Sequence, residues 1–325
     1  MIMKKSVVIL LVAVAVAGCA SLLGLYSAFD MNSKAKVSKE TSITDSSATV
    51  SREYKVGNFE KIEVEGNIRV EFVQGTSKGR MTVTAPSYEM EHLKVEVKGT
   101  SLEIGYDKSY FTQSNGRDKK RGPQTVVKVA SPSLRSIEMS LSAKFEATSL
   151  KQAGKIDIDV DTSGSVDIKT VDCGELSLSA DTSGTIRLGV VNATEVKAEP
   201  DTSGTIRIEK AQTANAVLKA DTSGRVIVSK LTTAYIRTSA DTSGSVEVES
   251  LAADNVVGRA DTSGRISLKG EATNVDFHAD TSGSIKAGEL KAETAKVGFD
   301  TGGKVVYCAR KTSHDGSSLV NTYKE

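Results

Sequence analysis

Apolar and polar residues follow a pattern that recurs at a fixed interval over the second half of the chain. Each repeat begins with the tetrapeptide Asp-Thr-Ser-Gly, and a variant, Asp-Thr-Gly-Gly, begins at Asp300. The full copies begin at Asp161, Asp181, Asp201, Asp221, Asp241, Asp261 and Asp280, so only the step to Asp280 is shorter, by a single residue. A fixed period of roughly 20 residues is typical of a solenoid, in which each repeat is one structural unit.

Within one repeat, apolar or small residues alternate with polar ones. In the copy at Asp201, Ile206 and Ile208 are apolar and the intervening Arg207 is charged. Apolar residues return ten residues after the Asp, and again five, three and one residues before the next Asp. Alternation with period two is the geometry of a β-strand with one buried face. Each repeat therefore predicts at least two short strands, with Ile206 and Ile208 inward and Arg207 toward solvent.

One repeat cannot bury enough apolar surface to fold alone. Ordering about 20 residues costs roughly 20–40 kcal/mol, whereas burying about seven modest side chains returns roughly 10–20 kcal/mol. Parallel stacking supplies the missing stability because every strand then pairs with its neighbours. The sequence predicts an all-β fold, a parallel β-helix with about 20 residues per rung and a rung spacing of about 4.8 Å.

The Asp-Thr-Ser-Gly tetrapeptide is expected to form a corner of each rung. Asp and Ser side chains accept hydrogen bonds from backbone N–H groups two residues further on, and Gly adopts positive φ without strain. Like charges stacked about 4.8 Å apart repel by about 0.9 kcal/mol in water, but a hydrogen bond to a carboxylate contributes roughly 1.5–3 kcal/mol. The Asp column is therefore expected to need no metal. Calcium, which takes roughly six to eight oxygen ligands, is the alternative, with candidates Asp181, Asp201, Asp221, Asp241 and Asp261.

The N-terminus has the pattern of an export signal. Lys4 and Lys5 precede an apolar run, which ends in Val-Ala-Gly-Cys at Cys19. This ending resembles a bacterial lipobox, after which the cysteine is lipidated and becomes the new N-terminus. Apolar residues continue to Phe29, so an uncleaved membrane anchor is the alternative. In both cases the body of the protein is expected in the cell envelope, outside the cytoplasm and tethered to a membrane, on its periplasmic side or at the cell surface.

The rest of the chain is less regular. Strand-like alternation without the repeat rhythm begins at Tyr54, and Ser87–His92 favours one helical turn. Ser140–Ala143 lies about one repeat before the first full copy and predicts a degenerate first rung. Leu319–Tyr323 is expected to cover the open end of the stack. The predicted regions are residues 1–19, a signal peptide with its lipobox (or an anchor to about residue 29); 20–53, a flexible tether; 54–133, an irregular β region; 134–310, the β-helix; and 311–325, a C-terminal cap.

Charge and cysteine usage exclude several classes of function. Lys and Arg number 42 against 41 Asp and Glu, so bulk charge does not favour nucleic acid as a partner. Cys173 and Cys308 fall in the first and last rungs, about 30 Å apart by rung counting, and cannot form a disulfide. Cys173 is expected to be a small buried residue. The basic run from Arg117 to Arg121 is expected to be a solvated loop, with a binding role as the alternative.

No enzyme is expected. Asp300-Thr301-Gly302 matches the aspartic-protease signature, but such an enzyme needs two carboxylates on one water, and this copy is one step of a ladder. Carbohydrate-active enzymes need clustered acids and aromatic sugar platforms. The repeats offer only Tyr235 near the surface and a single histidine, His278. We therefore assign no catalytic residue and no cofactor.

The chain resembles a known family from Phe59 onward. The stretch Phe-Glu-Lys-Ile-Glu-Val-Glu-Gly-Asn-Ile-Arg-Val-Glu-Phe-Val-Gln-Gly, the step from Leu134 to Ile137 and repeated Ser-Gly turns such as Ser163-Gly164 are similar to the head GIN domain of auto-transporter adhesins. The resemblance covers about residues 54 to 310. It implies a β-helical, extracytoplasmic protein of Bacteroidetes-type envelopes and supplies no catalytic residues. This chain departs from the usual Ser-Gly-Ser-Gly turn by using Asp-Thr-Ser-Gly.

These observations favour a membrane-tethered, non-enzymatic binding or adhesin-like module of the cell envelope or outer membrane. Its partners would be the membrane, through the N-terminus, and a glycan or a protein. The first alternative is a structural envelope protein that self-associates. The second is a carbohydrate-active β-helix enzyme.

Overall fold

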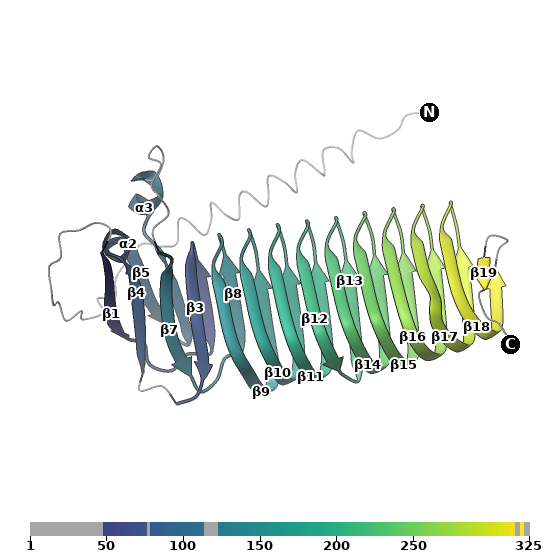
Figure 1. The fold of residues 1–325 in the computed structure, drawn as a ribbon, viewed down its shortest axis with the longest axis horizontal. Coiled ribbons are helices and arrows are strands. Elements are labelled where there is room, and N and C mark those ends of the chain that lie inside the picture. The colour runs from purple at the N-terminus through teal and green to yellow at the C-terminus, as the bar shows by residue number, and fades with distance from the viewer. Residues whose placement is uncertain (1–47, 77–78, 114–122, 316–318, 322–325) are drawn as a thin grey trace. The chain divides into compact units, whose positions relative to one another are not determined.

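The computed structural model describes residues 48–76, 79–113, 123–315 and 319–321, all of which belong to one compact unit, Glu40–Glu325. It contains 74% strand and 4% helix, arranged as a solenoid of about nine turns with an irregular N-terminal β region. The rungs stack side by side in chain order, from teal to yellow in Figure 1. The predicted fold class is confirmed.

The regular part of the stack consists of parallel strands that each pair with the strands before and after them. Most of these strands are long, about the length of a whole repeat. They are β8 (Ser136–Ser140), β9 (Lys144–Val160), β10 (Ser165–Ala180), β11 (Thr185–Pro200), β12 (Thr205–Gln212), β13 (Asn215–Ala220), β14 (Arg225–Ala240), β15 (Ser245–Ala260), β16 (Arg265–Ala279), β17 (Ser284–Phe299) and β18 (Lys304–Asp315).

Each rung is one long strand with two corners, followed by a tight turn. In β10 the in–out alternation is interrupted twice by two successive outward residues, Lys169–Thr170 and Gly174–Glu175. The interruptions divide the rung into three straight segments, which we call the first, second and third segments. The pattern had predicted at least two strands per repeat. The third segment starts with an outward residue, Glu175 in this rung, and runs to the next turn.

The core is a column of apolar side chains inside the stack. Ile206 and Ile208 have no exposed surface, whereas Arg207 between them is exposed. In register, Ile206 lies between Ile186 and Val226. Each such side chain contributes roughly 1.5–3 kcal/mol when fully buried. The predicted inward and outward assignment is confirmed.

The Asp-Thr-Ser-Gly turn differs from the prediction in two details. Thr222 and Ser223 have φ of 40° and 70°, so positive φ is adopted by these residues and not by the glycine of the turn. Two successive residues with positive φ, closed by Gly224 N donating to Asp221 O (2.5 Å), are typical of a type I′ turn. The Asp221 carboxylate accepts from the backbone N of the next residue (2.7 Å), not from the residue two further on. Both expectations were wrong because they assumed a corner in which the glycine adopts the positive φ.

The glycine is required by the close approach of neighbouring rungs. A Cβ added at Gly224 would collide with the carbonyl oxygen of Pro200 on the preceding rung. At Gly204 and Gly184 the same collision would occur with Ala180 and Val160. The turn therefore needs glycine for space, while the left-handed conformation falls on a β-branched residue for which it is unfavourable.

The N-terminal region continues the same stack with less regular rungs. β2 and β3 pair in parallel with β8 and β9 on one side and with β6 and β7 on the other. β1, β4 and β5 are antiparallel to their neighbours. β1 begins inside the segment predicted to be a tether. The elements are β1 (Thr49–Lys55), β2 (Lys61–Glu65), β3 (Ile68–Gln74), β4 (Arg80–Pro86), α2 (Ser87–His92), β5 (Leu93–Lys98), β6 (Ser101–Tyr106), α3 (Lys108–Gln113) and β7 (Thr125–Ser131).

Several local predictions can be compared with these elements. The helical turn at Ser87–His92 is confirmed as α2. Leu141 and Ser142 have φ of 50° and 73°, like Thr and Ser of the full turns, which confirms the degenerate first rung. Lys108–Gln113, just before the basic run, form α3. At the C-terminal end, β19 (Leu319–Asn321) pairs in parallel with β18, so these residues of the predicted cover do pair with the last rung.

Cys173 and Cys308 are both free. Cys173 is buried as predicted, and burial raises the pKa of its thiol to about 11. Cys308 is only partly buried. The predicted signal peptide, Cys19 and the basic run Arg117–Arg121 lie outside the described residues. Among the helices that the structure describes, none has the length and apolar character needed to cross a bilayer.

Candidate binding surface

The predicted Asp column is present along the turn edge of the stack. The Asp221 carboxylate oxygen Oδ1 accepts a hydrogen bond from the backbone N of Thr222, and the other copies make the same contact at 2.5–2.8 Å. Over the described ranges, no three His, Cys, Asp or Glu side chains are grouped so that they could hold a metal ion. Calcium binding at the calcium candidates named above stays an untested alternative.

A second column runs along the outer face of the third segments. Its members are the first residues of these segments, and each pairs in register with the next. The column changes character along the stack. The first three members are charged, and we call them the charged column: Lys155, Glu175 and Glu195. The next five are uncharged, and we call them the polar column: Asn215, Tyr235, Asn255, Asn274 and Thr294.

The side chains of the charged column form ion pairs with one another and with nearby side chains. Lys197 Nζ lies 3.2 Å from Glu175 Oε1 and 3.1 Å from Glu195 Oε1. Lys155 Nζ lies 2.6 Å from Asp157 Oδ1. Hydrogen bonds to Glu195 and Glu175 raise the pKa of Lys197. Exposed ion pairs of this kind contribute little to stability, and they leave few charges free for a ligand.

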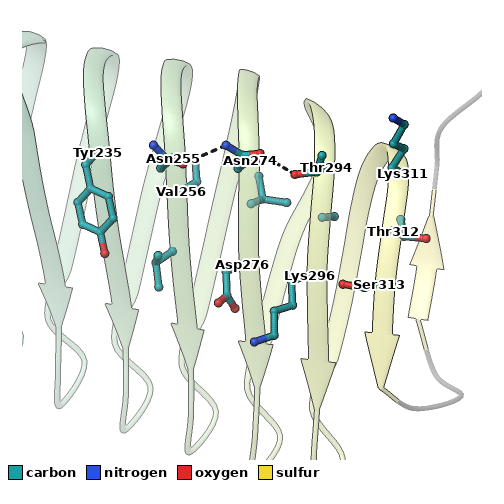
Figure 2. A pocket seen from close by; sticks show the side chains of 13 residues that line it. Tyr235, Asn255, Val256, Asn274, Asp276, Thr294, Lys296, Lys311, Thr312 and Ser313 are labelled. Atoms are coloured by element: carbon teal, nitrogen blue, oxygen red, sulfur yellow. Dashed lines mark hydrogen bonds between the residues drawn. The ribbon is translucent and has the colours of Figure 1, made fainter.

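Three members of the polar column form a directional hydrogen-bond ladder. Thr294 Oγ1 donates to Asn274 Oδ1 (2.7 Å), and Asn274 Nδ2 donates to Asn255 Oδ1 (3.1 Å), as the dashed lines in Figure 2 show. Both oxygens of the two amides are therefore engaged. No described residue accepts from Asn255 Nδ2, which leaves this donor at the end of the ladder nearest Tyr235.

Tyr235 lies beside the ladder with its ring spread along the strands and seen face-on in Figure 2. Arg237 Nη2 donates to Tyr235 Oη (3.3 Å) and helps to hold the ring in place. The ring is half-buried. An aromatic face fixed in this way on an outer surface is a platform for a flat or partly apolar partner.

Four members of the polar column, from Tyr235 to Thr294, line one side of a groove of about 550 Å³ on the outer face of β14 to β18. Two residues further along each third segment, Val257, Asp276 and Lys296 form its other side. Asp276 Oδ1 lies 3.0 Å from Arg259 Nη1, so its charge is already paired. The groove thus combines an aromatic ring, amide and hydroxyl groups, one small outward apolar side chain and two lysines, Lys296 and Lys311.

A further groove of about 790 Å³ lies at the corner between the second and third segments. Ala234, Ala253 and Ala272 contribute small side chains to its lining, and Arg310 on its rim is 3.4 Å from Glu293. Thr233 Oγ1 donates to the backbone oxygens of Ala214 and Tyr235, which fixes the corner. These contacts give the residues at the corner a structural role.

The N-terminal region holds a cluster of aromatic and polar side chains around Glu89. The Glu89 carboxylate accepts from Tyr106 Oη (3.0 Å), Thr125 Oγ1 (2.6 Å) and Tyr110 Oη (3.3 Å). The rings of Tyr106 and Tyr110 stack with centroids 4.2 Å apart. Burial raises the pKa of both phenols well above their ordinary value. Because the carboxylate is fully engaged, this cluster attaches α2 and α3 to the first rungs.

Asp107 begins the segment that leads into α3. Its carboxylate accepts from Ser109 Oγ (2.6 Å) and Tyr110 N (3.0 Å) and lies 3.2 Å from His92 Nδ1. Burial alone would raise the pKa of Asp107, but the hydrogen bonds from Ser109, Tyr110 and His92 hold it below its ordinary value. His92 is thus near a carboxylate, whereas His278 is exposed on the third-segment face and outside the groove lining.

Sequence reasoning identified Tyr235 as a surface residue but missed the column to which it belongs. The signal was present, since the first position of the third segment reads Glu, Glu, Asn, Tyr, Asn, Asn, Thr in successive repeats. It was missed because the apolar pattern alone does not locate the corner at which the third segment begins.

The family model described as "Putative auto-transporter adhesin, head GIN domain" matches residues 58–241 and 218–316 of the chain. The two matches together cover all of the regular repeats up to β18 and most of the N-terminal β region. No curated protein matches the chain.

Two solved structures from Parabacteroides share the fold. One, described as a putative adhesin from Parabacteroides distasonis, is 19% identical with a TM-score of 0.55, and the alignment covers 84% of this chain and 96% of that one. Another, described as a putative adhesin from Parabacteroides merdae, is 16% identical with a TM-score of 0.50, covering 85% and 94%. At this identity the likeness concerns the fold.

Proposed function

Because the chain belongs to the head GIN domain family of auto-transporter adhesins, we propose that it is a non-enzymatic, adhesin-like binding module tethered to a membrane outside the cytoplasm. The observation that carries this proposal is the family match, which extends from residue 58 to residue 316. The stacked rungs support it, since they present repeated outer columns over a long surface, as binding solenoids do.

The chemistry of the groove beside the polar column supports binding without catalysis. Glycoside hydrolysis commonly uses two carboxylates on either side of the scissile bond. Asp276 is the one carboxylate among the residues that line the polar groove, and it is paired with Arg259. Cys173 is buried with a raised pKa and is therefore a poor nucleophile.

The membrane tether rests on the N-terminal sequence. Cys19 follows an apolar run in a lipobox-like setting. Replacing it, Cys19→Ser, should abolish labelling by a radioactive fatty acid and leave an uncleaved precursor. Labelling that persists in the variant would contradict lipidation at this residue, and cleavage elsewhere would show a different export signal.

Binding is tested with the full chain in liposomes that carry a fluorescent lipid. These liposomes should attach to a surface coated with a glycan or an extracellular protein, and empty liposomes should not. Sedimentation velocity of the same chain tests the competing structural function. Self-association that rises with concentration, with no attachment to any surface, would contradict the adhesin proposal and favour a structural envelope component.

A further inference from the structure

We propose that the groove beside the polar column binds a neutral polysaccharide chain, with the Tyr235 ring as the stacking platform and Asn255 as a hydrogen-bond donor. The inference rests on the proposed adhesin function and specifies its ligand class and site. It starts from the difference between the charged and polar columns, which occupy the same position in successive rungs but carry different chemistry.

Hydrogen bonds join three members of the polar column across neighbouring rungs, and ion pairs do not. The charged members form ion pairs with Asp157 and Lys197, and the contact between Lys197 and Glu175 joins neighbouring rungs. In the polar column, Asn255 and Asn274 are exposed, yet they hydrogen-bond in one direction and leave the Asn255 Nδ2 donor unused. A single orientation of exposed amides presents defined donors to a ligand, because the oxygen and nitrogen of each amide can no longer exchange places.

The aromatic ring and the unused donor lie on adjacent rungs. Tyr235 pairs in register with Asn255, so the two side chains are about 4.8 Å apart along the stack. This distance is close to the length of one sugar ring. A pyranose that stacks its C–H face on Tyr235 would place a hydroxyl group within reach of Asn255 Nδ2 (Figure 2). Thr294 at the far end of the ladder offers a further hydroxyl.

The charge of the groove selects among ligand classes. Asp276 is already paired with Arg259, so the other charged side chains of the lining are two cations, Lys296 and Lys311. An anionic polysaccharide or a nucleic acid would need several unpaired cations. A lipid chain would need a larger apolar surface than Val257 and the tyrosine ring provide. A peptide that adds as a strand needs a free sheet edge. β14 to β17 are paired on both sides beneath the groove, and among the described strands only the end of β18 offers such an edge there. A neutral, hydroxyl-rich chain fits the groups present.

The length of the column suits a polymer. Residues of five consecutive rungs, from Tyr235 to Lys311, line the groove. At about 4.8 Å per rung, this run is as long as roughly three to four sugar rings laid along the stack. A single monosaccharide would contact only one or two rungs, so we expect affinity to rise with chain length up to about four sugars.

The test uses the full chain in fluorescent liposomes on a printed array of neutral and anionic glycans, followed by titration with the neutral oligosaccharide that binds best. Tyr235→Ala should weaken this binding at least tenfold, and Asn255→Ala about threefold to tenfold. Tyr235→Phe should stay within about threefold because the ring remains. The matched control is Glu195→Ala, the same column position two rungs away, which should stay within twofold. Thermal unfolding of each variant checks that the fold is unchanged.

The outcomes separate this inference from the proposed function. Attachment to proteins or to anionic glycans alone would overturn the neutral-polysaccharide site and leave the adhesin function in place. Neutral-glycan binding that Tyr235→Ala and Asn255→Ala leave unchanged would show that the ligand class is right and the site wrong, which also overturns the inference. No attachment to any surface would contradict both.

Discussion

The rungs that carry Glu195 and Asn255 have the same interior and different exteriors. Val196 and Val256, the inward neighbours of these two residues, are each 1% exposed and occupy the same place in the core. Outside, Glu195 belongs to an ion-paired cluster with Lys197, whereas Asn255 belongs to the hydrogen-bond ladder beside Tyr235. Each of the two rungs pairs in parallel with the preceding rung in the same register.

This comparison shows which positions of a rung the fold constrains. Inward side chains must fill the space between neighbouring rungs, and the turn glycine must leave room for the preceding carbonyl group. Neither requirement applies to the outward side chains of the third segment. They can therefore change from charged to uncharged without lowering the stability of the stack. We infer that stability and ligand recognition are set by different residues of the same repeat. Substitutions at the two kinds of position should therefore change either stability or ligand binding.

The largest effect is expected from a charge placed in the shared interior. Ile206→Asp would bury an unpaired carboxylate between Ile186 and Val226 and remove a core side chain, at a cost of several kcal/mol. Arg207→Asp, one residue away on the outside, should cost less than about 1 kcal/mol. Chemical denaturation of both variants measures the difference. Equal stability of the two would contradict the inward assignment and the stack built on it.

Much of this interior could be predicted from the sequence, because a core that recurs in every repeat leaves a period-two pattern that Ile206 and Ile208 show plainly. The degenerate rung at Leu141 was also predictable from its distance to the first full turn. The conformation of the turn was not, since the need for glycine at position 224 comes from the close approach of the preceding rung, and the positive φ then falls on Thr222 and Ser223. α3 and the parallel pairing of β2 with β6 depend on contacts between segments far apart in the sequence.

The candidate site was predictable only in part. Tyr235 was identified as a surface residue, and the absence of clustered acids and bases was used to argue against an enzyme. The ladder from Thr294 to Asn255 could not be inferred, because it depends on which outward residues of successive rungs share a register. The repeat that ends at Asp280 is shorter than the others, and this shift hides the alignment of Asn274 with its neighbours.

A smaller effect on stability is expected when a side chain is added at the turn glycine, where two rungs lie close together. Gly224→Ala should destabilise the protein by about 1–3 kcal/mol, because its new Cβ would collide with the Pro200 carbonyl and force the rungs apart. Gly154→Ala is the matched control, since a Cβ there meets no atom within 4 Å, and its effect should stay within about 1 kcal/mol. Thermal unfolding compares them. A neutral Gly224→Ala would mean that the turn glycine is not required for space.

The strain in the turn predicts a stabilising change. Thr222 and Ser223 hold φ of 40° and 70° with exposed side chains, and a left-handed conformation costs roughly 1–2 kcal/mol for ordinary residues. Replacing the pair by Asn-Gly, the dipeptide that type I′ turns prefer, should raise stability by about 1 kcal/mol. Denaturant titration measures the gain. A loss of stability would show that the Thr and Ser side chains make contributions that offset the strain.

The smallest effect is expected at the Asp column. Asp221→Asn should leave the melting temperature nearly unchanged, because the amide oxygen can accept the same hydrogen bond from Thr222 N. Chelation with EDTA should also leave it unchanged. Asp241→Ala, which removes the bond, should lower stability by roughly 1 kcal/mol. A fall on chelation that added calcium reverses would identify the column as a metal site.

The most direct test of the account is to remove one whole rung from each part of the stack. Deleting residues 181–200 joins Ala180 to Asp201 and removes Glu195, and deleting residues 221–240 joins Ala220 to Asp241 and removes Tyr235. Both proteins should keep a β-rich circular dichroism spectrum and unfold cooperatively, because each junction preserves the register. Only the second should lose binding to the neutral glycan in the liposome assay. Unfolding of either protein would contradict the equivalence of the rungs in the core, and equal binding by both would contradict the assignment of the ligand to the polar column.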